Sequence, residues 1–276
     1  MVFYEPGKTP HGLPRDPFKV SPPSIHLTPA PPSTTHPLTN PPPQKACVTP
    51  RPIGWISTRS LTGIDNLAPY SQFNNLSFDP PYVMFAANQD LHRQRKDSTV
   101  NAEATGEFCW NVATWELREL VNATAEWFAP GVDEFARCGV EKESARVLRG
   151  CSMVKRSPVK FECRYYSTVR LPGNAPMGAV DVVIGRVVAV HIDEGVLTEG
   201  VVDLGKVQPI ARCGYHQYVR IMGEAVFEMV IPGDERQGVG LEGDAEMAKA
   251  LGGGGGGGWN LRSEDGGLGG GCAARA

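Results

Sequence analysis

Two polar clusters in this 276-residue chain carry the side-chain types that bind a phosphorylated ligand. The first is residues 93–99 (RQRKDST), where cationic residues directly precede the start of a predicted helix. The first N–H groups of a helix have no partners within the helix and carry the positive end of its dipole. A neighbouring lysine and a hydroxyl would complete an anion site there. The same residue types also suit an ordinary helix cap, so the pattern leaves both interpretations open.

The second cluster lies where one predicted strand ends and the next begins. It comprises residues 51–58 (RPIGWIST) and residues 66–74 (NLAPYSQFN). The side chains of Ser57, Thr58, Ser71 and Asn74 could converge there with free backbone N–H groups. Such a site suits a polar, anionic ligand with amide-like edges. Polar strand ends are also often only solvated, and this alternative stays open.

The elements that must position these clusters are mostly strands. Runs of β-branched and aromatic residues between breakers predict strands at Ile53–Arg59, Asn66–Ser71, Tyr82–Ala87, Phe108–Ala113, Val159–Leu171 and Val180–Ile192. Helices are predicted at Asp97–Thr105 and Leu117–Ala125. Asp97 and Ser98 are cap-type residues at the start of the first helix, and Gly106 supplies its stop. Closely spaced strands with few short helices favour a mainly β, antiparallel barrel over a doubly wound parallel sheet.

Composition excludes several classes of protein. Lys and Arg number 27 against 30 Asp and Glu, so no excess of positive charge favours nucleic-acid binding. The chain has no unbroken apolar stretch long enough to span a membrane, and Met1–Pro10 lacks the apolar region of a secretory signal. The seven cysteines are scattered without a C-x-x-C pair, which indicates reduced thiols. We therefore expect a cytoplasmic protein with no nucleic-acid and no membrane partner.

The two ends of the chain differ from its middle. Residues 1–50 hold 14 of the 24 prolines, and residues 252–258 are seven consecutive glycines. Neither end carries enough apolar residues to offset the entropy of ordering the chain. We predict a proline-rich arm at 1–50, one barrel domain at 51–222 and a disordered glycine-rich tail at 223–276.

Motifs for hydrolysis, nucleotide-triphosphate binding and zinc ligation are absent. The sequence contains no G-x-S-x-G, no G-x-x-x-x-G-K-[ST] and no H-E-x-x-H. Its six histidines are dispersed, and none stands at a metal-ligand spacing from a cysteine or carboxylate. We therefore predict no catalytic acid, base or nucleophile and no metal site.

Taken together, the middle of the chain resembles the flavin reductase-like family, the FMN-binding split barrels that include flavoredoxin. No single piece is specific, but the order and spacing of the pieces are. The matching pieces include Pro50–Thr58, Asn66–Ser71, Asp79–Pro81, Arg95–Ser98, Glu103–Phe108 and Asp203–Tyr215. His11–Lys19 also resembles the family's N-terminal stretch, and Val20–Thr49 then interrupts the pattern as a disordered insertion.

The resemblance implies an FMN-binding split β-barrel, antiparallel and Greek-key-like, that forms a homodimer. It assigns Lys96, Ser98, Ser57 and Thr58 to the phosphate and ribityl chain, and Ala68–Asn74 to the isoalloxazine ring. Arg51 either pairs with the phosphate or caps its strand. The full set of expected cofactor-binding residues is Arg51, Ser57, Thr58, Ala68, Pro69, Tyr70, Ser71, Phe73, Asn74, Lys96, Asp97 and Ser98.

The resemblance also implies a function in which the cofactor carries the chemistry. A reduced nicotinamide, NADH or NADPH, would pass hydride to N5 of FMN, and a separate oxygenase could take up the reduced flavin. The alternative is a flavoredoxin-like electron carrier that binds FMN without using a nicotinamide. A third reading is a barrel that has lost its ligand, which the retained polar residues disfavour. Tyr215 and His216, after a glycine turn, lie either near the site and the dimer partner or in an ordinary loop.

Overall fold

The computed structural model describes residues 47–90, 92, 94–174, 178–227 and 229. The predictions for the arm at 1–46 and for the tail from 230 onward lie outside the described residues. The chain divides into two compact units, Met1–Val226 and Phe227–Ala276. All elements described below belong to the first unit.

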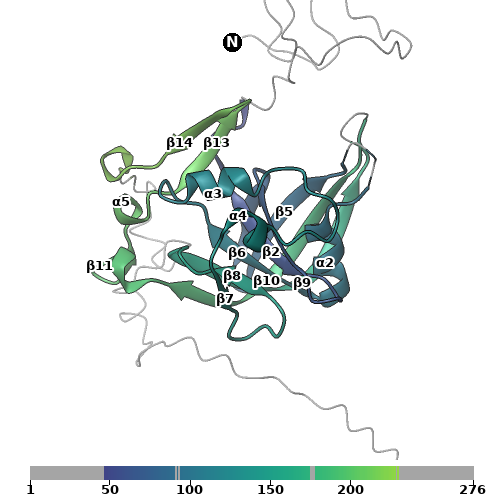
Figure 1. Ribbon diagram of the computed structural model, residues 1–276. Coiled ribbons are helices and arrows are strands. Elements are labelled where there is room, and N and C mark those ends of the chain that lie inside the picture. The colour runs from purple at the N-terminus through teal and green to yellow at the C-terminus, as the bar shows by residue number, and fades with distance from the viewer. Residues whose placement is uncertain (1–46, 91, 93, 175–177, 228, 230–276) are drawn as a thin grey trace, which may run out of the picture. The chain divides into compact units, whose positions relative to one another are not determined.

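A seven-stranded antiparallel sheet dominates this unit, with the strand order β3-β2-β6-β9-β10-β5-β4 (Figure 1). Its end strands β3 and β4 are consecutive in the chain and separated by only two residues, so the sheet must curl until its edges approach each other. Gln72, between them, accepts a hydrogen bond from the backbone N–H of Ala86 at 2.8 Å. The strands are β2 (Gly54–Arg59), β3 (Asp65–Tyr70), β4 (Phe73–Phe78), β5 (Pro81–Asn88), β6 (Glu107–Val112), β9 (Val159–Leu171) and β10 (Val180–Ile192).

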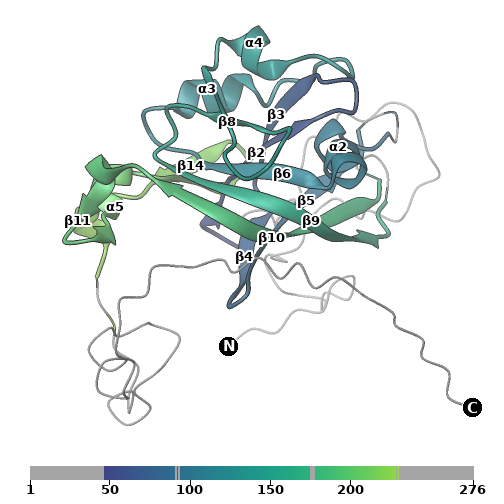
Figure 2. The same cartoon turned by 90° about the horizontal axis from the view of Figure 1, so that it is seen from below.

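Smaller sheets and short helices surround the barrel (Figure 2). A three-stranded sheet combines β1 (Arg51–Pro52), β13 (Ile210–Gly214) and β14 (Gln217–Arg220), and two ribbons pair β7 (Lys142–Ser144) with β8 (Ser152–Val154) and β11 (Leu197–Thr198) with β12 (Val201–Val202). The helices are α2 (Asp97–Thr105), α3 (Arg118–Ala123), α4 (Glu134–Cys138) and α5 (Leu204–Val207), with 3₁₀ turns η1 (Glu194–Val196) and η2 (Gly223–Ala225).

The predicted mainly β, antiparallel architecture is confirmed. The strands β9 and β10 and the helix α2 have the predicted bounds. Gly106 ends α2 in the left-handed conformation, with φ 74°, and its N–H donates to the carbonyl of Ala102. The strand β4 was not predicted, because it is an edge strand of mostly exposed residues, half of them polar, and lacks the apolar alternation that marks a strand.

Two apolar clusters pack on opposite faces of β2 and β3. Ile56 and Tyr70 belong to the cluster inside the barrel, whereas Trp55 and Leu67 belong to the cluster beneath α3 and α4. This division follows from the two-residue period of a strand. Gly54 has no side chain because Phe73 occupies the space, and a Cβ there would lie 2.7 Å from Cδ2 of Phe73.

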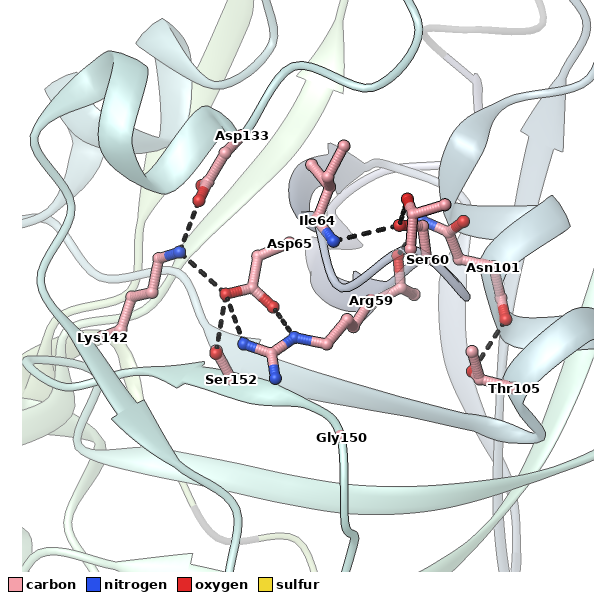
Figure 3. Close-up of polar contacts among 12 residues, drawn as sticks. Arg59, Ser60, Ile64, Asp65, Asn101, Thr105, Asp133, Lys142, Gly150 and Ser152 are labelled. Atoms are coloured by element: carbon pink, nitrogen blue, oxygen red, sulfur yellow. Dashed lines mark hydrogen bonds and ion pairs between the residues drawn. The ribbon is translucent and has the colours of Figure 1, made fainter.

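An ion cluster around buried Asp65 holds the turn end of the β2–β3 hairpin (Figure 3). The Asp65 carboxylate, 2% exposed, accepts bonds from Arg59 at 2.8 Å, Lys142 at 2.7 Å and Ser152 at 2.9 Å, and Lys142 also reaches Asp133. Burial alone would raise the pKa of Asp65, but the three donors hold that pKa below its ordinary value. The carboxylate thereby fixes the hairpin whose other residues form the candidate site.

Candidate functional site

The start of α2 offers an anion-binding end without a side-chain cap. Lys96 is the N-cap residue, and no side chain caps the first turn of this nine-residue helix. The expectation that Asp97 and Ser98 cap the helix is wrong, because both side chains are engaged elsewhere. Asp97 accepts a bond from the backbone N–H of Gly131 at 3.1 Å. The Lys96 ammonium lies 4.3 Å from the centre of the Trp127 ring, so its charge stays at this helix end without a carboxylate partner among the described residues.

Two buried hydroxyls follow in the first turn of α2. Ser98 accepts a hydrogen bond from the side-chain amide of Asn66 at 2.8 Å and also pairs with the hydroxyl of Tyr70, whose pKa is raised by burial. Thr99 is 0% exposed, and its Oγ1 has no hydrogen-bond partner among the described residues. A buried hydroxyl without a partner carries a desolvation cost that a bound polar group would remove.

Thr58 joins this group, whereas Ser57 does not. The Asn101 amide, one helical turn after Ser98, donates to Oγ1 of Thr58 at 3.2 Å and so ties β2 to α2. The neighbouring Ser57 points to the opposite face of the sheet, where its Oγ accepts a bond from Asn111 at 3.2 Å. The pleat makes this unavoidable, since successive residues of a strand face opposite sides.

The same alternation divides the predicted residues of β3. Ala68 and Tyr70 pack into the cluster inside the barrel, and Pro69 faces the other way. The N–H of Leu67 points outward from the sheet edge and donates to buried Glu134 at 2.9 Å. Pro69, two residues later, has no N–H to expose at that edge, which is the position where a sheet tolerates proline.

The remaining predicted residues lie apart from the α2 end or are buried. Phe73 stacks on Trp110, with ring centres 5.2 Å apart and 7° between planes, and is 8% exposed. Ser71 stands in the turn before β4, and Asn74 is exposed on β4. Arg51 lies in the three-stranded sheet, opposite Arg212. The structure therefore brings together Thr58, Ala68, Tyr70, Lys96, Asp97 and Ser98. It orients the side chains of Ser57 and Pro69 to the other face of the sheet, and Phe73 packs with Tyr70 in the cluster inside the barrel.

Four residues at this end were not among the predicted site residues: Asn66, Thr99, Asn101 and Trp127. Asn101 could have been found, because it lies three residues after Ser98 and therefore on the same helix face. Trp127 carries no such signal, since it approaches Lys96 from the loop between α3 and α4.

An ion network holds the segment that leads into α2. Arg95 donates to Asp181 at 2.7 Å and to both oxygens of Glu103, and Arg170 also donates to Asp181 at 2.7 Å. Burial would raise the pKa of Asp181, but the two guanidinium groups hold it below its ordinary value. Arg95 is thus neutralised by carboxylates, which leaves Lys96 as the cation at the helix start.

The described residues contain no group of three or more His, Cys, Asp or Glu side chains that could hold a metal ion. No helix among them is long and apolar enough to cross a membrane. Cys109, Cys151 and Cys163 are buried, and burial contributes to raising the thiol pKa of Cys109 and Cys163, as does the Cys151 side chain for Cys109. The α2 end can bind a polar or anionic ligand through one lysine, a helix dipole, hydroxyls and amides.

Comparison with known proteins places this geometry in a family. The family described as "Flavin reductase like domain" matches residues 46–211. The chain belongs to the flavin reductase-like family. Among curated proteins, this family member is 34% identical to a protein of Aquifex aeolicus over 178 residues, covering 64% of this chain and 87% of the relative. It is 30% identical to YwrF of Bacillus subtilis, covering 67% and 89%.

Solved structures of the family share the fold. Nitrilotriacetate monooxygenase component B from Bacillus cereus matches with a TM-score of 0.62 and 27% identity, over 67% of this chain and 90% of that one. A flavin reductase with a split barrel domain from Shewanella frigidimarina gives a TM-score of 0.57 at 22% identity, covering 68% and 89%. Flavoredoxin of Desulfovibrio vulgaris gives a TM-score of 0.53 at 16% identity, over 69% of this chain and 94% of that one. The predicted split-barrel fold is therefore confirmed.

Proposed function

We propose that this flavin reductase-like protein binds FMN non-covalently at the start of α2 and acts as an NAD(P)H-dependent flavin reductase. The observation that carries the proposal is the uncapped α2 start, where Lys96, buried Ser98 and unpartnered Thr99 gather in one helical turn. Helix N-termini with adjacent cations and hydroxyls bind phosphate esters. The family membership supplies the flavin as the phosphorylated ligand.

The residues present fit FMN. The Lys96 charge and the dipole of α2 would hold the phosphate, and the hydroxyls of Thr58 and Ser98 would bind its ester oxygens or the ribityl chain. The segment Ala68–Asn74 would border the ring, as the resemblance implies, through its backbone and through Ala68 and Tyr70. The hydroxyl of Thr99, buried without a hydrogen-bond partner among the residues that the structure describes, is the strongest sign that this end binds a further polar group.

Bound FMN would supply hydride chemistry at its N5 atom, with NADH or NADPH as donor. The protein's own part is to bind and orient the ring and to leave one face of it open. Neither a general acid nor a nucleophile is required from the chain, which agrees with the absence of such a motif. The polar groups near the ring would tune its affinity for electrons by hydrogen bonding.

Two further features belong to the proposal. The family member would work as a homodimer, with the flavin near the subunit interface, and gel filtration with light scattering would measure its mass. It would deliver reduced flavin to a separate oxygenase, which the 27% identity to a monooxygenase component favours. The competing function is a flavoredoxin-like electron carrier that binds FMN and does not react with nicotinamides, supported by the shared fold.

Flavin titration tests the binding half of the proposal. We expect added FMN to bind the purified protein with a shifted absorption spectrum and quenched flavin fluorescence. Lys96→Met should weaken FMN binding about tenfold, the size of one charge-assisted contact to phosphate. Lys155→Met is the matched control, because Lys155 is an exposed lysine paired with exposed Glu141, and it should leave the affinity unchanged. A protein that takes up no FMN would contradict the proposal.

Nicotinamide oxidation separates the two functions. The FMN-loaded protein should oxidise NADH or NADPH faster than the same concentration of free FMN. Equal rates, combined with normal FMN binding, would favour the electron carrier over the reductase.

A further inference from the structure

A cleft lies between α3, with the segment before it, and the β13–β14 hairpin. It encloses about 310 Å³ and is lined by Trp115, Arg118, Glu119, Val121, Asn122, Ile210, His216 and Tyr218. This volume is at the lower end of small-molecule sites. None of these residues belongs to the proposed flavin site.

Strand register aligns one wall of the cleft. Arg212 lies opposite Tyr218, and Ile210 lies opposite Arg220, so all four residues share one face of the β13–β14 hairpin. The guanidinium of Arg212 lies 4.5 Å from the centre of the Tyr218 ring and donates to the Tyr218 hydroxyl. This wall therefore presents aromatic and apolar surface together with positive charge.

Helix α3 and the segment before it form the other wall. Arg118, Val121 and Asn122 lie three and four residues apart, which places them on one helix face. The backbone N–H of Trp115 donates to the carbonyl of Gln208, just before β13, at 2.9 Å. The guanidinium of Arg118 lies 4.0 Å from the centre of the Trp115 ring, and that of Arg220 lies 5.1 Å from the same ring.

Arg212 and Arg220, which flank the cleft, differ in their partners from Arg59, Arg95 and Arg170. Arg59, Arg95 and Arg170 each donate to a buried or half-buried carboxylate. Arg212 and Arg220 instead donate to neutral acceptors, namely Tyr218, the Tyr215 carbonyl and the Gln208 amide. Their positive charge is therefore not cancelled by any carboxylate within ion-pair distance in the described part of the chain.

Arg220 also has an unused donor. Its Nε is buried and has no hydrogen-bond partner among the described residues. The acidic residue in the lining, Glu119, is 79% exposed and forms an ion pair with Arg118 at 3.3 Å. Guanidinium groups held by aromatic rings, with donors to spare, are prepared for an anionic ligand with little loss of side-chain entropy.

We propose that this cleft binds the phosphate-bearing adenosine end of a dinucleotide, with the base between the hairpin and α3. Arg212 and Arg220, which flank the cleft beside its lining residues Tyr218 and Trp115, would contact the phosphates. The apolar wall of Val121 and Ile210 and the ring of Tyr218 suit a planar base. Asn122 can pair with the edge of adenine, and Glu119 can accept from ribose hydroxyls. Choosing the nicotinamide donor as this dinucleotide rests on the proposed function, whereas binding of an adenosine phosphate does not.

Isothermal titration of the flavin-free protein with ADP tests the proposal. We expect saturable binding, and in Arg212→Gln/Arg220→Gln a dissociation constant raised tenfold or more. Arg137→Gln/Arg186→Gln loses the same charge from exposed positions away from the cleft and should stay within twofold of wild type. No ADP binding by the wild type, or equal loss in both double variants, would overturn the proposal.

Further arms identify the ligand. Inorganic phosphate or benzoate binding as tightly as ADP would overturn the assignment to a nucleotide. Tighter binding of 2′,5′-ADP than of ADP would point to NADPH as the donor, and weaker binding of 2′,5′-ADP would point to NADH. Asn122→Ala should weaken ADP binding severalfold. This variant tests the site if circular dichroism shows that the double arginine variant is unfolded. An unchanged affinity in Asn122→Ala would overturn the base position.

The flavin titration keeps the two proposals separate. Arg212→Gln/Arg220→Gln should bind FMN as tightly as wild type. If this variant loses FMN binding in parallel with ADP binding, the arginines belong to the flavin site and the second site is overturned. If the wild type binds ADP but no FMN, the proposed function is contradicted, whereas the proposal of a nucleotide site in the cleft is supported.

Discussion

The start of α2 and the cleft beside β13–β14 obtain the positive charge for binding an anion from different sources. At α2 the charge comes from a helix dipole and one lysine, while the adjacent arginine is cancelled by Asp181 and Glu103. Beside the cleft, the charges of Arg212 and Arg220 are not cancelled, because their hydrogen-bond partners among the described residues are neutral. The comparison shows that counting cations in a sequence says little, since the partner of each cation decides whether its charge is available.

The two regions share one scaffold, so a scaffold defect should affect both. Gly185→Ala would place a Cβ 2.3 Å from Cε1 of buried Phe108 and 3.2 Å from the carbonyl of Arg164. Overpacking of this kind costs about 1–3 kcal/mol, and the melting temperature should fall by several degrees. Gly150→Ala is the control, since its nearest neighbour would be 3.7 Å away. Equal melting temperatures for the two variants would contradict the close packing inside the barrel.

Removing Asp181 should separate the two regions. Asp181→Asn leaves Arg95 paired with Glu103 alone, so more positive charge is available directly before Lys96, and FMN binding should tighten while ADP binding in the cleft stays unchanged. The loss of a 3% exposed carboxylate with two guanidinium partners should also lower the free energy of unfolding at pH 7 by about 1–3 kcal/mol. The control Glu141→Gln breaks an exposed ion pair and should have little effect.

The same variant has a definite pH dependence. The folded protein holds the pKa of Asp181 below its value in the unfolded chain. The stability that Asp181 contributes is therefore present above the unfolded pKa and is lost as pH falls through the folded pKa. Chemical denaturation at pH 7 and at about pH 3 should show the gap between wild type and Asp181→Asn shrinking at the lower pH. A gap that widens toward low pH would contradict the ion network.

A smaller effect should distinguish the two faces of β2 and α2. Ser98→Ala removes a hydroxyl from the α2 end and should weaken FMN binding by a factor of about five to ten, near 1 kcal/mol. Ser57→Ala removes a hydroxyl that bonds with Asn111 on the other face, so it should cost stability but leave FMN affinity unchanged. Fluorescence titration measures both, and a larger effect of Ser57→Ala on binding would reverse the assignment of faces.

Local patterns predicted the long strands and α2 because their signals are local. The β-branched runs of β9 and β10 and the stop at Gly106 need no tertiary information. The polar composition of the α2 start was also readable as a candidate anion site. Whether Asp97 and Ser98 cap that helix was not, because their partners Gly131 and Asn66 come from distant segments.

Side-chain orientation was the other limit. Ser57 and Thr58 are adjacent and equally polar, and only the register of β2 decides which one faces α2. The charge of Arg212 and Arg220 was invisible for a similar reason, since their neutral partners depend on the pairing of β13 with β14. The sequence thus identified the candidate residues, whereas the fold determines which of their side chains face the same site.

The most direct test compares FMN with riboflavin, which has the same ring but no phosphate, in titrations of the wild type and of Lys96→Met. If the α2 start binds the phosphate, wild type should bind FMN at least about tenfold more tightly than riboflavin, and Lys96→Met should lose most of that difference. Equal affinities of the wild type for the two flavins would contradict a phosphate site at α2.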